Sequence, residues 1–289
     1  MNHFALDSRR GKVNIQPTIA SSNLLPSDNM KTYICVAHAG GQGKTTVAQL
    51  LFRNILRKNS KYNLVSADFV DDTGRSKIGK FYPDQVDELG TGARLIAAKL
   101  ENDPNAALRY WDKFGTILMR GSAVIDVGAN VVSLLKQWAH HRSAFRVLQM
   151  SNAPPSEILL VCKAEKHAIE DVAELVSTIA DNKFIPYEHV TVVLNEVGGS
   201  FGRIDVRSVI KEAAPDASVR FVSLPRCTSE LWTQLEQTNT PIDRALEMSD
   251  REISETFGTD IWSATAGLAD LKSWVTSVDK EWKNAGIFK

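Results

Sequence analysis

The sequence predicts an α/β protein with a doubly wound, mostly parallel sheet flanked by helices and a helical C-terminal extension. Two observations carry this prediction. Short apolar runs rich in β-branched residues, such as 190–194 (VTVVL), alternate with longer segments of helical periodicity. These runs are almost continuously apolar, as expected for strands that are buried on both faces of a parallel sheet. Because parallel strands need crossover connections, the alternation places helices on both sides of one sheet.

The elements follow in order along the chain. Residues 1–30 are rich in Ser, Asn and Pro and lack periodicity, which predicts a flexible N-terminal arm. A main domain over 31–247 is expected next, with a helical extension over 248–289 that packs on the domain or on a second copy. The expected strands are 32–37, 62–67, 121–126, 158–163, 190–195 and 219–223. The expected helices are 44–58, about 90–101, 104–118, 130–142, 165–181 and 205–213, with 228–289 mostly helical.

Composition excludes several classes of protein. The formal net charge is +0, so the chain as a whole is not an electrostatic binder of nucleic acid, although a local basic patch stays compatible with it. No apolar stretch reaches the ~18 residues that span a bilayer. No apolar region follows the basic residues near the N-terminus, as it would in a signal peptide. The three cysteines lie in or beside apolar runs without metal-ligand spacing, which favours reduced thiols and a cytoplasmic location.

A Gly-rich loop follows the first expected strand and opens the first expected helix. Strand, Gly-rich turn and Gly-Lys-Thr at a helix start form the architecture of a phosphate-binding loop. Glycines let backbone N–H groups turn toward an anion, and the helix N-terminus adds the positive end of its dipole. We therefore expect Lys44 to neutralise the β- and γ-phosphates and Thr45 to bind Mg²⁺. The residues of this cradle are Gly40, Gly41, Gln42, Gly43, Lys44, Thr45 and Thr46.

A carboxylate ends the expected strand at 121–126, and it suggests a metal ligand. The run reads GSAVID and ends at Asp126. In proteins with a phosphate-binding loop, such a carboxylate holds Mg²⁺, usually through water. The alternative is an ordinary Asp at the turn after a strand, but the loop upstream favours the catalytic interpretation. Gly128 follows shortly after, and its N–H would approach a γ-phosphate.

A second carboxylate group follows the expected strand at 62–67. Asp68 ends this strand, and Asp71 and Asp72 come soon after it. A carboxylate here would join the Mg²⁺ shell or orient the attacking water. The alternative is a solvated acidic loop. The spacing leaves open which of the three carboxylates faces the water.

Residues 40–46 resemble the deviant Walker A motif of the ParA/MinD-type ATPases, which reads Lys-Gly-Gly-x-Gly-Lys-Thr-Thr. The general phosphate-loop pattern has a glycine where this chain has His38, and the paired glycines narrow the family. The resemblance covers about residues 32–247. It extends to Asn195, which resembles the late-strand Asn whose amide reads the base, and to Pro225, in the segment that lines the base pocket. Residues 126–128 (DVG) resemble the plasmid conjugal-transfer and stability branch, the TraL- or StbB-like proteins.

The sequence departs from this pattern at Ala39. Family members carry their signature lysine at this place, and it reaches the phosphates of a partner across a dimer. A missing positive charge near the transition state predicts slow hydrolysis, since a comparable arginine finger contributes roughly 10³–10⁵ in rate. A substitute cation would restore part of this rate. Arg75 and Lys77 are the candidates, unless both belong to a solvated loop.

The resemblance implies ATP and ADP binding with Mg²⁺, and a nucleotide-dependent homodimer that acts as a switch. The implied partner is a protein of a partition, positioning or conjugal-transfer complex, with DNA as a further candidate. The implied reaction is slow attack of water on the γ-phosphate, which breaks the β–γ phosphoanhydride. Two alternatives stay open. Ala39 favours a non-hydrolysing nucleotide-binding adaptor, and the same fold also suits a small-molecule ATP-dependent ligase or kinase.

Overall fold

The computed structural model describes residues 31–57, 61–90, 106–182, 184–202 and 204–288. The expected N-terminal arm and nearly all of the helix expected at 90–101 lie outside these ranges. Within them, seven strands form one parallel sheet in the order β3-β2-β4-β1-β5-β6-β7. The strands are β1 (Thr32–Val36), β2 (Asn63–Ala67), β3 (Val86–Glu88), β4 (Ala123–Val127), β5 (Ser156–Lys163), β6 (Tyr187–Asn195) and β7 (Val219–Leu224).

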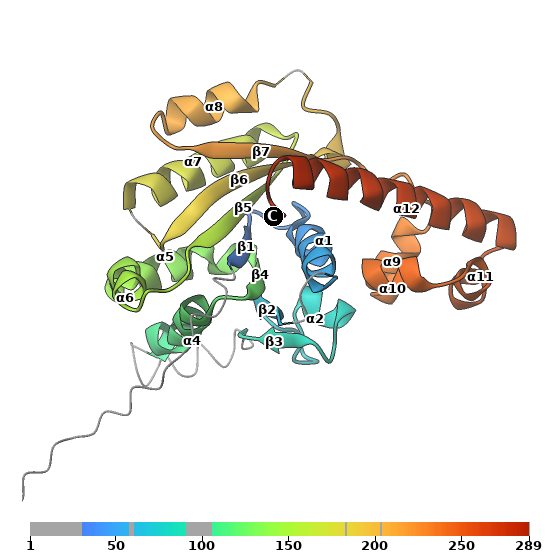
Figure 1. The fold of residues 1–289 in the computed structure, drawn as a ribbon, viewed down its shortest axis with the longest axis horizontal. Helices are drawn as coiled ribbons and strands as arrows, with labels where there is room; N and C mark the ends of the chain where they lie inside the picture. Colours follow the sequence, from blue (N-terminus) through green and yellow to red (C-terminus); the bar gives the residue numbers. More distant parts are fainter. Residues whose placement is uncertain (1–30, 58–60, 91–105, 183, 203, 289) are drawn as a thin grey trace, which may run out of the picture.

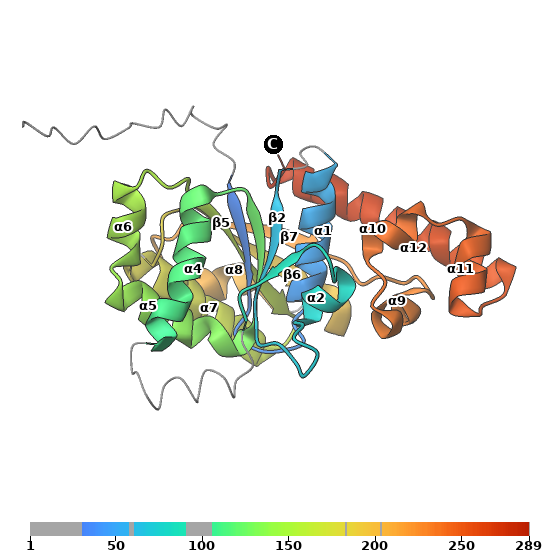
Figure 2. The same cartoon turned by 90° about the horizontal axis from the view of Figure 1, so that it is seen from below.

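Helices cover both faces of the sheet (Figures 1 and 2). One layer holds α1, α2 and the C-terminal helices, and the other holds α4 to α8. The helices of the first layer are α1 (Lys44–Leu56), α2 (Lys77–Phe81), α9 (Trp232–Thr238), α10 (Ile242–Glu247), α11 (Asp250–Phe257) and α12 (Ile261–Asn284). Those of the second are α4 (Ala106–Arg120), α5 (Val132–His141), α6 (Ala144–Met150), α7 (Lys166–Asn182) and α8 (Val206–Ala213).

Burial explains why the strands are apolar throughout. In β1, Tyr33 and Cys35 belong to the core under α1, whereas Ile34 belongs to the core under α4, α5 and α7. Successive side chains of a strand point to opposite faces, so a sheet covered on both faces needs apolar residues at every position. The predicted fold class, a doubly wound parallel sheet with helical C-terminal elements, is confirmed.

The elements that sequence patterns missed are short. All six expected strands are present, with ends that shift by at most three residues, as at Tyr187 against 190. The missed ones are β3, α2 and α6. β3 has three residues, two of them acidic, and α2 has five. Segments of this length do not complete the apolar periods by which strands and helices are recognised.

The C-terminal helix α12 packs on the domain of its own chain. It runs from the outlying α11 back across the sheet to a point beside α1 (Figure 1). Trp282 is fully buried and donates its indole N–H to the Ser223 carbonyl at the end of β7 (3.1 Å). Arg53 of α1 forms an ion pair with Asp279 (2.9 Å). These contacts fix the segment that follows β7, which forms part of the site described next.

Candidate functional site

The carboxyl ends of the parallel strands form an open pocket of ≈ 740 Å³. This is where ligands bind in open α/β sheets. The pocket lies between the loop after β1, the ends of β2, β4, β5 and β6, the segment after β7, and helices α9 and α12. Ten of the sequence-predicted site residues line it together: Gly40, Gly41, Gly43, Lys44, Thr45, Thr46, Asp68, Asp126, Asn195 and Pro225.

The Gly-rich loop turns sharply at two glycines. Gly41 has φ +71° and Gly43 has φ +94°, a region that side-chain-bearing residues adopt only with strain. Gly43 is the N-cap of α1, and no described side chain caps this helix. The first N–H groups of α1 therefore lack the partner that an ordinary N-cap provides. A helix N-terminus in this state is a site for an anion such as phosphate.

Lys44 folds back over the loop. Its ammonium donates to the Ala39 carbonyl (3.2 Å), and burial lowers the pKa of this lysine. Burial disfavours the charged form of an amine, whereas the neighbouring Asp126 and Asp68 favour it. A phosphate in the loop would give this partly buried cation a stronger partner than a neutral carbonyl.

Asp126 is buried beneath the loop, with one oxygen satisfied and one not. Thr45 donates its hydroxyl to Oδ2 (2.8 Å), whereas Oδ1 accepts no hydrogen bond from any residue that the structure describes. Burial raises the pKa of Asp126 to about 6, against the opposing effects of the Thr45 bond and the Lys44 charge. A buried carboxylate oxygen without a donor is what a cation would satisfy. Asp126 and Thr45, with Asp68 nearby, therefore fit Mg²⁺.

The number of protein ligands also fits this ion. No group of three or more His, Cys, Asp or Glu residues that could hold a metal occurs in the described part of the chain. Mg²⁺ keeps several waters and is commonly bound through one or two carboxylates plus substrate phosphates. A site with a hydroxyl and two carboxylates beside a phosphate loop matches this preference and not that of an all-protein metal cage.

Gly128 leaves the space that the Asp68 carboxylate occupies at the pocket, and its own N–H does not have the role that the sequence suggested. A Cβ on Gly128 would lie 1.9 Å from Asp68 Oδ1, so only glycine leaves room for this carboxylate. The Gly128 N–H donates to the Ala67 carbonyl (3.1 Å) and is not free to approach a γ-phosphate as the sequence suggested. Asp68 Oδ1 also accepts the Phe69 N–H (2.8 Å), which fixes the orientation of the carboxylate.

The structure does not bring Asp71 into the pocket. Asp71 accepts the Thr73 N–H (2.8 Å) and pairs with the Lys80 ammonium (2.6 Å). The bond from Lys80, and after it those from Thr73, hold the pKa of Asp71 well below its usual range. Asp71 and Asp72 are exposed, and Asp71 shapes the turn before α2. Of the three candidate carboxylates, Asp68 is the one that faces the loop.

Asn195 braces the loop, where the sequence suggested that it reads a base. Its amide Nδ2 donates to the Gln42 carbonyl (2.8 Å), and its Oδ1 accepts the Val197 N–H (3.1 Å). A Cβ on Gly43 would lie 2.3 Å from Nδ2, so Asn195 packs directly on the loop. The Gln42 side chain points away from the pocket and accepts the Lys163 N–H (3.0 Å). The ends of β5 and β6 thus hold the loop in place.

Cations surround this pocket, and sequence reasoning found only some of them. Lys77 lines it at the start of α2, where the Ser76 side chain accepts the Gly79 N–H (3.1 Å) and caps the helix. Arg75, the other candidate, is exposed in the loop before α2 and is not part of the lining. Arg226 lines the pocket within the segment after β7 that the family resemblance implied, whereas Lys163 lines it but was not predicted. For Lys163 a signal existed, because it ends an apolar strand as Asp126 does.

Aromatic residues form the wall opposite the loop. Trp274 of α12 donates its indole N–H to the Pro225 carbonyl (2.7 Å). Trp232 of α9 meets Trp274 edge-on, with ring centroids 5.3 Å apart, and both line the pocket. The C-terminal helices therefore supply part of the site, and they hold Pro225 in place.

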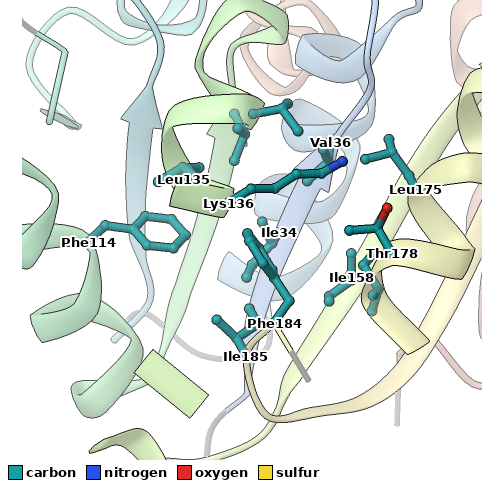
Figure 3. Close-up of a pocket in the computed structure, with 13 residues that line it drawn as sticks. Ile34, Val36, Phe114, Leu135, Lys136, Ile158, Leu175, Thr178, Phe184 and Ile185 are labelled. Atoms are coloured by element: carbon teal, nitrogen blue, oxygen red, sulfur yellow. The ribbon is translucent and has the colours of Figure 1, made fainter. Parts of the chain in front are cut away.

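A second cavity lies on the other face of the sheet and does not suit a nucleotide. Figure 3 shows its walls, which are apolar side chains of β1, β5, α4, α5 and α7 with Lys136 and Thr178 among them. Its open volume is ≈ 30 Å³. That is room for about two water molecules. The polar pocket at the strand ends is therefore the candidate functional site.

Comparisons with known proteins return distant likenesses in structure. Scans against protein-family models and curated proteins find no match. Similar solved structures include a McdA–ATP complex from Cyanothece (13% identity, TM-score 0.45, covering 86% of this chain and 98% of that one). MinD from Pyrococcus horikoshii with Mg-ADP is similar too (13%, TM-score 0.46, 84% and 95%). A third is a putative plasmid partition protein from Borrelia burgdorferi bound to AMPPNP (13%, TM-score 0.42, 84% and 98%).

Likenesses this distant do not say which residues of this chain act, so its chemistry rests on the pocket. Within the described ranges, no helix is both long and apolar enough to cross a membrane.

Proposed function

We propose that this protein binds ATP with Mg²⁺, hydrolyses it slowly, and uses the nucleotide as a switch for assembly. The observation that carries the proposal is the Thr45–Asp126 pair beneath an uncapped, glycine-turned helix N-terminus. An anion site and a buried, incompletely satisfied carboxylate lie side by side there. A nucleoside triphosphate with its metal satisfies both at once.

Each group around the Gly-rich loop has a task in binding. The N–H groups at the start of α1 receive the phosphates, and Lys44 moves from the Ala39 carbonyl to a phosphate oxygen. Thr45 and Asp126 would hold Mg²⁺. When bound, that ion neutralises charge on the phosphates and on the leaving group. The nucleoside lies toward Pro225 and Trp232, whose surfaces suit a flat ring.

Asp68 is the residue that we assign to hydrolysis. Its carboxylate lines the pocket near Asp126 and Lys44, and the Phe69 N–H fixes its orientation. From there it accepts a hydrogen bond from the attacking water and so orients a lone pair of that water toward the γ-phosphate. The attack forms one P–O bond and breaks the β–γ bridge, with ADP and phosphate as products.

The switch and its partners rest on the resemblance of residues 40–46 to the ParA/MinD-type ATPases. We propose a homodimer that forms with ATP and separates after hydrolysis. Residues 126–128 place this chain with the TraL- or StbB-like branch of that family in this proposal, and its partner would be a protein of a partition, positioning or conjugal-transfer complex, with DNA as a further candidate. Ala39 is the specific observation that favours a second function, a nucleotide-sensing adaptor that does not hydrolyse ATP.

Binding and sedimentation with ADP and with a non-hydrolysable ATP analogue test the proposal. We expect Mg²⁺-dependent binding of both nucleotides and faster sedimentation with the analogue alone. Lys44→Ala should lose both effects, whereas Lys80→Ala, at an exposed lysine of α2 that pairs with Asp71 outside the pocket, should keep them. Identical behaviour of wild type and Lys44→Ala would end the switch proposal. Single-turnover hydrolysis, with and without DNA, separates the slow ATPase from the adaptor.

A further inference from the structure

Lys163 is a cation of the pocket to which neither the loop motif nor the proposed function assigns a task. It ends β5, which pairs with β1 up to Val36 and Leu160 and then continues beyond the end of β1. The last residues of β5 therefore run beside the Gly-rich loop that follows β1. This placement brings a lysine of a distant segment to the phosphate-binding loop.

The side chain of Lys163 lies over the first half of the loop. Its ammonium is 4.0 Å from the position that a Cβ on Gly41 would take, and its Cδ is 4.0 Å from the equivalent position on Gly198. The chain thus extends across the loop and lines the pocket. It lies on the β5 side of Gly41, whereas Asp126 and Thr45 lie on the β4 side.

The backbone of Lys163 is anchored independently of its ammonium. The Lys163 N–H donates to Gln42 Oε1 (3.0 Å), and Lys163 pairs with Asn195 across to β6. The ammonium forms no ion pair with a carboxylate of the described residues. A half-buried cation that is fixed at its base, lines the pocket and has no ion-pair partner among the described residues is placed to bind an anion.

We infer that Lys163 binds the phosphate chain of the nucleotide from within the same chain, and so provides positive charge that Ala39 does not. The inference rests on the proposed function. At the transition state negative charge builds up on the leaving β-phosphate and the bridging oxygen, so a cation on the phosphate chain supports hydrolysis as well as binding. Lys77 lies on the other side, near Asp126 and Lys44, and therefore does not duplicate this position.

The test substitutes Lys163 with Met, which keeps the aliphatic stem and removes the charge. The backbone bond to Gln42 does not depend on the side chain, so the loop should remain folded. We expect Mg-ATP affinity to fall about 10- to 100-fold. Adenosine, which has no phosphate, should bind equally well to both proteins, and Lys163→Arg should restore most of the ATP affinity. Lys166→Met, an exposed lysine that pairs with Glu170, is the matched control.

Two outcomes would overturn the inference. One is wild-type ATP affinity and turnover in Lys163→Met, in a protein whose Lys44→Ala variant has lost binding. The other is a loss that appears only at protein concentrations where dimers form, because that would place the cation on a partner's nucleotide. Failure of wild-type protein to bind ATP at all would instead contradict the proposed function, so the two failures are distinguishable.

Discussion

The two walls of the pocket at the strand ends differ in how the chain builds them. The loop wall consists of the pocket-lining residues of the Gly-rich loop within 40–46, with Asp68 directly after β2 and Asp126 near the end of β4. The far wall consists of Lys163, Asn195 and residues 224–229, with Trp232 and Trp274 from the C-terminal helices. The loop wall is local, since its geometry follows from glycines and a helix start. The far wall depends on contacts between distant segments, such as the bond from Trp274 to Pro225.

The two walls therefore differ in the role that we assign to each. The loop wall holds the groups that suit phosphate and Mg²⁺, whereas the far wall fixes the loop and offers a surface for the nucleoside. Substitutions in the first should therefore change turnover and metal dependence. Substitutions in the second should change affinity and stability, with the charged Lys163 as the residue that joins the two.

The largest effect is expected for Asp68→Asn, which tests whether the loop wall supplies the group that orients the attacking water. The substitution keeps the shape and the bond from the Phe69 N–H but weakens the acceptor that orients water. We expect kcat for ATP hydrolysis to fall about 10²- to 10⁴-fold with ATP affinity nearly unchanged. Asp71→Asn is the control, because Asp71 pairs with Lys80 outside the pocket. Equal losses in the two variants would remove the assignment of Asp68.

Gly43→Ala breaks the contact at which the two walls meet. Gly43 has φ +94°, and a Cβ there would lie 2.3 Å from Asn195 Nδ2. We expect nucleotide affinity to fall about 100-fold, with a loss of about 1–3 kcal/mol in the free energy of unfolding. Calorimetric titration and denaturant unfolding measure the two quantities.

Gly40→Ala is the matched control for this substitution. Gly40 does not have a positive φ, and a Cβ there meets no described atom within 4 Å. This variant should fold and bind as wild type does. A severe loss of nucleotide affinity in Gly40→Ala would mean that the loop closes more tightly around the nucleotide than the space at Gly40 indicates.

Asn195→Ala tests how far the far wall supports the loop. The substitution leaves the Gln42 carbonyl and the Val197 N–H without their partner. We expect ATP and ADP affinity to fall about tenfold, because an unsatisfied buried group costs about 1–3 kcal/mol and loosens the loop. The ratio of ATP to GTP affinity should not change. A changed ratio would restore the base-reading role that the family resemblance implied.

The sequence named more of the residues that line the loop wall than of those that line the far wall. Glycine spacing and strand-ending carboxylates are local signals, so the loop residues, Asp68 and Asp126 could be named before the fold was known. Local signals do not reveal packing. Asn195 was recognised, but its amide donates to the Gln42 carbonyl and accepts the Val197 N–H, contacts that residue spacing does not show. Asp71 was grouped with Asp68, although its bond to Lys80 turns it away from the loop.

The same reason explains why the sequence did not reveal the part that Lys163 and the two tryptophans of the far wall have in the site. Their part in the site requires the strand order, which places β5 beside β1, and the return of α12 over β7. Neither is written in the spacing of residues. Trp262 resembles Trp274 in its helical context, yet it is 83% exposed while Trp274 is buried. The direction in which α12 packs decides which tryptophan is buried, and helical periodicity over a few turns does not show that direction.

The smallest expected effect uses Cys227 as a native probe of the far wall. Cys227 is half-buried and lines the pocket, whereas Cys35 and Cys162 are fully buried. Burial raises the pKa of all three thiols, to about 12 for Cys162, so the thiolate that reacts with a disulfide reagent is scarce. At pH 8 we expect one slowly reacting thiol in the native protein, which Cys227→Ser removes. Mg-ATP should slow this reaction several-fold by covering the pocket, and reaction at an unchanged rate would place the nucleoside away from this wall.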